Sequence, residues 1–217
     1  MPIRNLNKVF APRHVAVIGA REKRASLGYK VLENLQDAGF PRAVYSVSPK
    51  YKKGRETLCY AKTTDLPDPV DLAVICSPAP TVPEVVRECE QAGIPGLVIL
   101  SAGFRESGKG GEELELAVQR EANKFDGLRI VGPNCLGIIA PHAALNASFA
   151  SGMPAKGHVA VISQSGALCT SVLDWALREN IGFSHFVSVG NTTDVSIGDL
   201  IDYFACDGRT ESIILYV

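Results

Sequence analysis

His14-Val15-Ala16-Val17-Ile18 is a short run rich in β-branched residues, and it ends at Gly19. Its length and composition are typical of a parallel strand that is buried on both faces. Apolar residues then recur at helical spacing up to Gly39, and Ala43–Val47 has the composition of a second strand. A strand, a helix and a strand within about 35 residues make a right-handed β-α-β unit. This unit predicts an α/β fold.

The same alternation continues downstream. Further strands are predicted at residues 71–76, 96–100 and 128–131, and helices at 83–92 and 112–125. Strands that alternate with helices form a doubly wound parallel sheet. We therefore expect a Rossmann-like domain over residues 1–145.

A second α/β unit is expected over residues 152–217. The stretch 151–157 contains glycine and proline and has the character of a linker. Strands are predicted at 158–162, 186–189 and 212–217, with helices after residue 166 and at 197–204. No helix follows the last strand, although a parallel strand normally needs cover on both faces. We expect the chain to be a fragment of a longer protein, or a protein that lost its C-terminal part.

Composition narrows the function classes. The chain has 217 residues, 46% of them hydrophobic, and a formal net charge of -1. These values indicate a globular protein and disfavour a general nucleic-acid or membrane-surface binder. No apolar run approaches the ~18 residues of a spanning helix, and no secretion signal is present. The six cysteines form no CxxC pair and the four histidines lie at no metal or triad spacing, so we expect no metal site and a cytoplasmic location.

The loop after the first strand resembles a dinucleotide-binding loop but departs from GxGxxG, because Arg21 stands where the second glycine would be. The second strand also leads into Lys50, where an NAD-binding protein would have an acid. The cations in these two loops suit a ribose that carries an extra phosphate, as in NADP or coenzyme A; the alternative is that they are solvated surface charges. The candidate ligand-binding residues of the two loops are Gly19, Ala20, Arg21, Ser26, Gly28, Ser48, Pro49 and Lys50, with Lys23 and Arg24 as further cations.

Small residues follow the next three predicted strands. Because the carboxyl ends of parallel strands share one edge of a sheet, these residues are expected beside the ligand crevice. The alternative is that they only connect strands and helices, and Cys135 could either pack in the core or line the path of a thiol. The candidates are Ser77, Pro78, Ala79, Ser101, Ala102, Gly103, Asn134 and Cys135.

Ser163-Gln164-Ser165-Gly166 lies between a predicted strand and a predicted helix. The N-terminus of a helix presents free N–H groups and a partial positive charge, which favour a phosphoryl group. The alternative is an N-cap serine with no ligand. The flanking pattern is Ser-x-Ser-Gly rather than Gly-x-Ser-x-Gly, which disfavours Ser165 as a hydrolase nucleophile.

Several of these stretches occur together in a recognisable order. Gly132-Pro133-Asn134-Cys135-Leu136-Gly137, Ser163-Gln164-Ser165-Gly166-Ala167 and Gly190-Asn191 follow Val17-Ile18-Gly19-Ala20 and Ser101-Ala102-Gly103-Phe104. In this order they resemble the α part of NDP-forming acyl-CoA synthetases: the ADP-forming acetyl-CoA synthetases, with succinyl-CoA synthetase α as a more distant relative. The resemblance spans almost the whole chain.

The resemblance implies a CoA-binding Rossmann-like domain followed by an incomplete flavodoxin-like, succinyl-CoA-synthetase-type domain. It implies that an acyl phosphate reacts with CoA, and that a phosphohistidine carries phosphate to an ATP-grasp β subunit or domain. In such enzymes the helix that matches Ser163–Gly166 steadies the phosphohistidine. That histidine belongs to a motif downstream of Val217, so ATP, ADP and Mg²⁺ would act only through absent parts.

The resemblance also implies partners: CoA, a small carboxylic acid and other subunits in an oligomer. This chain alone is then expected to bind CoA without completing the reaction. Protein lysine acetyltransferases share the same N-terminal part, so a CoA-sensing regulatory module is the alternative. An NADP oxidoreductase is disfavoured because no catalytic acid or base is placed near a nicotinamide site. The acyl group, and ADP against GDP, stay open.

Overall fold

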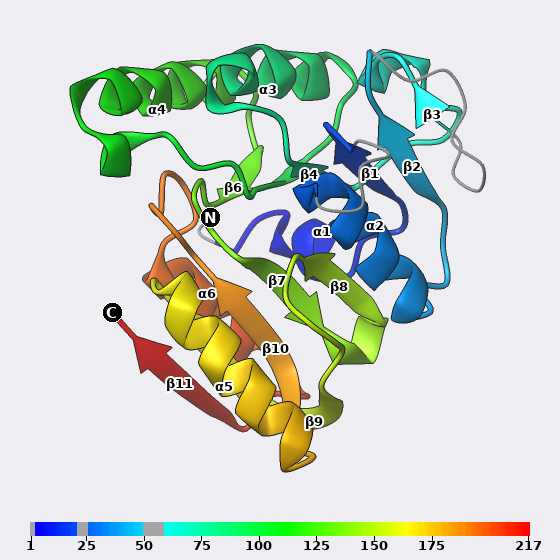
Figure 1. Cartoon of the computed structure of the whole chain (residues 1–217), viewed down its shortest axis with the longest axis vertical. Coiled ribbons are helices and arrows are strands. Elements are labelled where there is room, and N and C mark those ends of the chain that lie inside the picture. Colours follow the sequence, from blue (N-terminus) through cyan, green and yellow to red (C-terminus); the bar gives the residue numbers. More distant parts are fainter. Residues whose placement is uncertain (1–2, 21–25, 50–58) are drawn as a thin grey trace.

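The computed structural model describes residues 3–20, 26–49 and 59–217, which contain a six-stranded and a five-stranded sheet (Figure 1). The first sheet is parallel throughout, in the order β3-β2-β1-β4-β5-β6. Its strands are β1 (Val15–Ile18), β2 (Val44–Val47), β3 (Cys59–Tyr60), β4 (Leu72–Ile75), β5 (Gly96–Ile99) and β6 (Arg129–Val131). This order is that of doubly wound dinucleotide-binding sheets, so the predicted Rossmann-like topology is confirmed.

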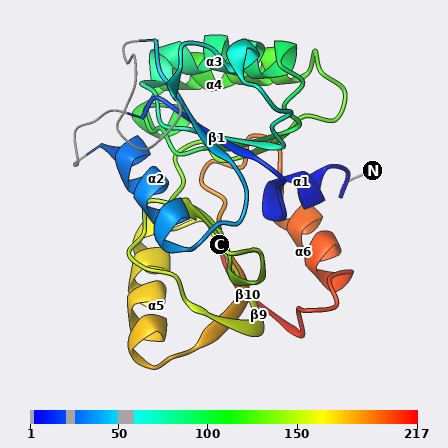
Figure 2. The same cartoon turned by 90° about the vertical axis from the view of Figure 1, so that its right-hand side faces the viewer.

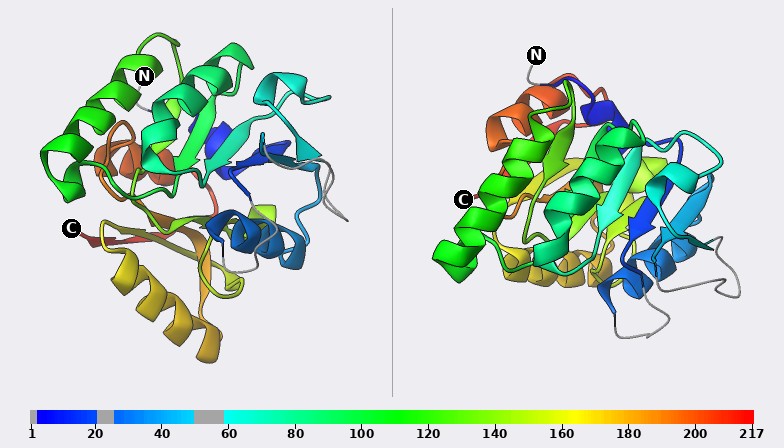
Figure 3. Two further views of the ribbon diagram at one scale, coloured as in Figure 1. Left: turned by 45° about the horizontal axis from the view of Figure 1, so that its top comes forward. Right: turned by 90° about the horizontal axis from the view of Figure 1, so that it is seen from above.

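Helices cover both faces of the first sheet. They are α1 (Leu6–Phe10), α2 (Leu27–Asp37), α3 (Val82–Gln91) and α4 (Lys109–Ala122). Figure 3, seen from above, shows α3 and α4 side by side over the sheet, while α1 and α2 lie on its other side in Figure 1. Alternate β1 residues point to different cores, because Ala16 packs on the α3 side and Val17 on the α1 side. This two-sided burial explains the continuous apolar run.

The second sheet is mixed, in the order β11-β9-β10-β7-β8. Its strands are β7 (Gly137–Ala140), β8 (Leu145–Ser148), β9 (Ala155–Ser163), β10 (Gly182–Ser188) and β11 (Ser212–Tyr216). The strands β9, β10 and β11 are parallel to one another, whereas β7 pairs antiparallel with both β10 and β8. Helices α5 (Gly166–Arg178) and α6 (Ile197–Ala205) lie on opposite sides of this sheet (Figure 2). The α/β class with a second, flavodoxin-like unit is confirmed.

Three strands were not expected from the sequence: β3, β7 and β8. Strands β7 and β8 are short, fully buried and joined by a 3-10 turn at Pro141–Ala143, so they show no alternating pattern. They pair with each other and with β10, so the second sheet includes strands from Gly137 onwards. The stretch 151–157 is only partly a linker, because β9 begins at Ala155. The division into units 1–145 and 152–217 stays a prediction.

One hydrophobic cluster joins the two sheets. It contains Phe10 and Val17 from the first unit, together with Ile138, Val187 and Phe204 from around the second sheet. Separate clusters fill the spaces under α3 and α4 and under α5. Because the middle cluster draws on both sheets, each sheet buries one face against elements of the other unit.

Polar contacts reinforce this junction. The side chain of Asn34 on α2 donates to the carbonyl oxygens of Ser148 and Ala150, each at 2.8 Å. The buried Arg129 on β6 pairs with Asp194 at 3.0 Å and with Asp199 at 2.9 Å, both of which follow β10. Within the described ranges, no helix is both long and apolar enough to cross a membrane.

Candidate functional site

The predicted crevice lies at the carboxyl edge of the first sheet. In the sheet register, Ile18 lies opposite Val47 and Ile75, and Ile75 lies opposite Ile99. The strands β1, β2, β4 and β5 therefore end at one level, and the loops that follow them leave the sheet side by side. Ligands of open α/β sheets bind at this edge.

Backbone hydrogen bonds connect these loops. The N–H of Gly19 donates to Val47, that of Cys76 to Ile18 and that of Leu100 to Ile75, at 2.8–3.0 Å. Further along the edge, the N–H of Asn134 donates to the carbonyl oxygen of Ser101 at 2.9 Å. The structure thus brings together the described candidate residues after β1, β4, β5 and β6.

Two glycines let the first loop pack closely. Gly19 has a φ of 85°, and a Cβ there would lie 2.8 Å from the backbone nitrogen of Ser77. A Cβ at Gly28, on α2, would lie 2.5 Å from the Cα of Ala20. Ser26 caps the same helix and accepts a hydrogen bond from Tyr29 at 3.3 Å. Contacts within the protein therefore require both glycines.

The predicted cations are not among the residues that the structure describes. Arg21, Lys23, Arg24 and Lys50 lie outside the described residues, so their role in phosphate binding stays a prediction. After β2, Ser48 is buried and its N–H donates to Tyr60 at 2.9 Å, whereas Pro49 is exposed.

Among the polar residues at this edge, Ser77 gives the clearest indication of a missing hydrogen-bond partner. Its hydroxyl is buried and finds no hydrogen-bond partner within the described part of the chain. A buried hydroxyl without a partner is costly, so a ligand that accepts or donates a hydrogen bond here would recover free energy. Ser101 is satisfied, because its hydroxyl donates to the carbonyl oxygen of Ser77. The unpartnered hydroxyl is compatible with the amide-rich arm of CoA.

The neighbouring residues provide surface for a ligand. Pro78 and Ala102 are exposed and Ala79 is buried. Gly103 has a φ of 108°, and a Cβ there would lie 3.2 Å from the Cβ of Ala79. The loops after β4 and β5 therefore touch each other through small residues.

Asn134 and Cys135 differ in exposure. Asn134 is exposed, with a φ of 57°, whereas Cys135 is buried and its thiol donates to the carbonyl oxygen of Ile99 at 3.3 Å. Burial raises the pKa of the Cys135 thiol to about 12, so it stays protonated at neutral pH. The geometry therefore favours packing over nucleophilic chemistry.

The second predicted site is the start of α5. Ser165 is its N-cap, and the hydroxyl of Ser165 accepts from the N–H of Leu168 at 3.2 Å. The hydroxyl of Ser163 accepts from the N–H of Ser165 at 3.0 Å. Both hydroxyls thus take part in the turn. Gln164 is exposed, and a Cβ added to Gly166 would meet no other element of the described chain within 4 Å, which leaves the first turn of α5 open to an anion.

Arg105 and Glu106 follow Gly103 and Phe104 and are not among the candidate residues. In the structure Glu106 accepts from the N–H groups of Gly103 at 2.6 Å and Phe104 at 3.1 Å, and from Asn191. Desolvation acts to raise the pKa of Glu106, but the hydrogen bonds outweigh it and leave that pKa lowered. Nothing in the local sequence marks these long-range contacts.

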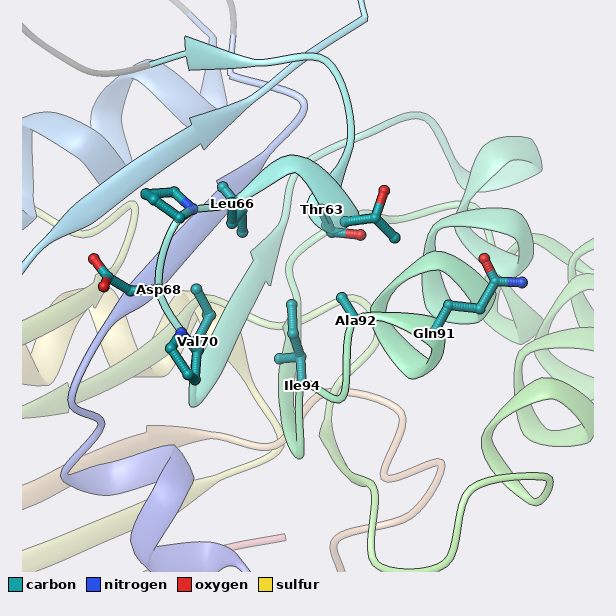
Figure 4. Close-up of a pocket in the computed structure, with 10 residues that line it drawn as sticks. Thr63, Leu66, Asp68, Val70, Gln91, Ala92 and Ile94 are labelled. Atoms are coloured by element: carbon teal, nitrogen blue, oxygen red, sulfur yellow. The ribbon is translucent and has the colours of Figure 1, made fainter.

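A cavity of about 360 Å³ lies away from this edge, lined by Thr63, Asp68, Gln91 and Ile94 among others (Figure 4). These residues precede β4 and β5 and lie at the amino end of their strands. Asp68 there accepts a hydrogen bond from the hydroxyl of Tyr45. No candidate site residue in the described part of the chain lines this cavity. No group of three or more His, Cys, Asp and Glu side chains in residues 3–20, 26–49 and 59–217 could hold a metal ion.

Two protein-family models match the chain. The model described as a CoA binding domain matches residues 13–141, and the model described as a succinyl-CoA ligase like flavodoxin domain matches residues 156–217. The chain is 43% identical over 212 residues to an ADP-forming acetate–CoA ligase of Methanocaldococcus jannaschii, covering 98% of this chain and 29% of that protein.

Two further relatives agree. The chain is 40% identical over 217 residues to the α subunit of ADP-forming acetate–CoA ligase I of Pyrococcus furiosus, covering 98% of this chain and 47% of that subunit. The solved acetyl-coenzyme A synthetase 1 of Ca. Korarchaeum cryptofilum, in complex with phosphate and ADP, superposes with a TM-score of 0.93 at 40% identity, over 98% of this chain and 45% of that one. The predicted resemblance is confirmed, and the chain spans less than half the length of each relative.

Proposed function

We propose that this chain, which belongs to the family of CoA-binding domains, is the CoA-binding part of an ADP-forming acetyl-CoA synthetase. The observation that carries the proposal is the alignment of small-residue loops, with the unpartnered Ser77 hydroxyl among them, at the carboxyl edge of a sheet in the order 3-2-1-4-5-6. The two curated ligases named above support a ligase over a CoA-sensing regulatory module.

The first sheet would hold CoA. CoA supplies the thiol that receives the acyl group. The cations Arg21 and Lys50 would attract its phosphates, and Ser77 would bond its arm. The exposed surfaces of Ala102 and Asn134 would border the path of the thiol. Because Cys135 is protonated and hydrogen-bonded, it would not compete with CoA as an acyl acceptor.

The second unit would hold the phosphoryl group. The open first turn of α5, from Ser163 to Gly166, offers N–H groups and the positive end of a helix dipole. Ser163 accepts a hydrogen bond from Val189, and the next residue, Gly190, lies against Pro133. This short path between the two sites supports an acyl transfer in which the CoA thiol attacks an acyl phosphate, the acyl group passes to the sulfur and inorganic phosphate leaves.

The remaining parts of the reaction would lie elsewhere in the whole protein. We propose that a phosphohistidine, ATP or ADP with Mg²⁺, and an ATP-grasp β subunit or domain complete it. The acyl substrate would be a small carboxylic acid, and the assembly an oligomer in the cytoplasm. On this proposal, the 217-residue chain incubated with acetate, CoA, ATP and Mg²⁺ forms no acetyl-CoA, and turnover by the chain alone would contradict it.

Site-resolved amide hydrogen exchange tests the two assignments separately. CoA should slow exchange in the loops after β1, β4 and β5 and leave the first turn of α5 unchanged. Inorganic phosphate at high concentration should act at α5. Protection by CoA that is confined to α5, or to the cavity at Thr63, would contradict the assignment.

A further inference from the structure

Asn191 lies where the two units meet. It is 7% exposed and follows β10, in a loop that rests on the turn after β6. The N–H of Asn191 donates to the carbonyl oxygen of Pro133 at 2.9 Å, and that of Thr193 donates to Gly132 at 3.1 Å. A Cβ added to Gly190 would lie 2.2 Å from the oxygen of Pro133. The backbone of this loop is therefore in direct contact with the turn that carries Asn134.

The side chain of Asn191 links two carboxylates of the first unit. Its Nδ2 donates to Glu106 Oε2 at 2.8 Å and to Glu115 Oε2 at 2.9 Å. Arg105 donates to the backbone carbonyl oxygen of Asn191, and the hydroxyl of Thr193 donates to Glu115 Oε1 at 2.8 Å. A primary amide has two N–H groups on one nitrogen, so it can serve both carboxylates at once. Hydrogen bonds to charged groups are among the stronger ones in proteins.

These contacts reach the candidate CoA site in two places. Glu106 uses its other oxygen, Oε1, to accept from the N–H of Gly103 at 2.6 Å. Nδ2 of Asn134 lies 3.4 Å from Oδ1 of Asn191. Asn191 therefore contacts Asn134 directly through a hydrogen bond, and it reaches the backbone of Gly103 through Glu106.

We propose that Asn191 is a positioning residue for CoA: through Glu106 and Asn134, the second unit completes a CoA site whose other residues lie in the first unit. This proposal rests on the proposed CoA binding. It assigns a role in ligand binding to a residue outside the CoA-binding sheet.

Calorimetric titration of the chain with CoA tests the proposal. Asn191→Ala should weaken CoA binding by about ten-fold, the scale of one hydrogen bond to a charged group. Asp194→Asn is the matched control, because Asp194 also joins the units, accepting from Arg129 and Ile130 at the far end of β6. It should lower thermal stability and leave CoA affinity unchanged, since it touches no candidate CoA loop.

Two further measurements separate positioning from stability. Asn191→Ala, but not Asp194→Asn, should speed amide exchange at residues 101–104 well below the unfolding temperature. If Glu106 transmits the effect, Glu106→Gln should weaken binding about three-fold alone and add little to Asn191→Ala. If Asn191→Ala does not fold, the CoA affinity of Glu106→Gln, a change at an exposed residue, tests the proposal in its place. Unchanged CoA affinity in these folded variants would overturn the proposal alone, whereas no CoA binding by the unaltered chain would overturn the proposed function as well.

Discussion

Ser77 and Ser101 lie at adjacent strand ends and differ in one respect. The hydroxyl of Ser101 has an acceptor in the carbonyl oxygen of Ser77, whereas the buried hydroxyl of Ser77 has no partner in the described part of the chain. A satisfied hydroxyl stabilises the fold by about 1 kcal/mol, and an unsatisfied one costs about as much or more. We therefore expect a structural role for the hydroxyl of Ser101 and a ligand-binding role for that of Ser77.

Ser77→Ala should leave the free energy of unfolding unchanged or slightly higher, because it removes an unsatisfied polar atom. It should also weaken CoA binding several-fold. Ser101→Ala, the matched control, should lower stability by about 1 kcal/mol. Urea unfolding and titration calorimetry measure both effects. A stability loss in Ser77→Ala with unchanged CoA affinity would mean that its hydroxyl serves the fold.

At the scale of elements, the parallel strands of the first sheet other than the two-residue β3 could be predicted, because each is a continuous apolar run between turn residues. The candidate loops followed from them, since strand ends in a parallel sheet share an edge. Strands β7 and β8 could not be predicted, because they are short and their pairing depends on β10. The contacts of Asn191 could not be predicted either, because its partners Glu106 and Glu115 are 85 and 76 residues away in sequence.

The start of α5 yields a prediction at this scale. Ser165→Ala removes the N-cap hydrogen bond to Leu168 and should lower stability by about 1 kcal/mol. Ser171 on the same helix is exposed and bonds only within it, to the carbonyl oxygen of Ala167, so Ser171→Ala should change stability little. Urea unfolding followed by circular dichroism compares the two. Equal effects would show that Ser165 does not cap α5.

At the scale of the molecule, the core between the sheets contains a titratable group. His185 on β10 is buried beside Phe10 and Phe204, and burial lowers its pKa from 6.5 to about 4. Asp207, 3.6 Å away, acts in the opposite direction, and the charges of Arg209 and His142 act with burial. Between these two pKa values the unfolded chain binds more protons than the folded chain. The contribution of His185 to the free energy of unfolding is therefore fully present above pH 6.5 and is lost as the pH falls towards 4.

This difference in pKa is equivalent to about 3 kcal/mol. His185→Phe should remove that part of the pH dependence of the unfolding free energy, while the exposed His158, changed to Gln, should leave it in place. Urea unfolding at a series of pH values between 4 and 7.5 measures it. An unchanged pH dependence in His185→Phe would place the titrating group elsewhere.

Calorimetric titration of the 217-residue chain with CoA and with NAD measures whether the first sheet selects CoA. Lys50 stands where an NAD-binding sheet has an acid, and the loop after β1 carries Arg21 in place of a glycine, so the two ligands should differ. We expect a single CoA site per chain with measurable affinity, weakened in Ser77→Ala, and no detectable binding of NAD. Equal or tighter binding of NAD, or no heat with CoA, would contradict it.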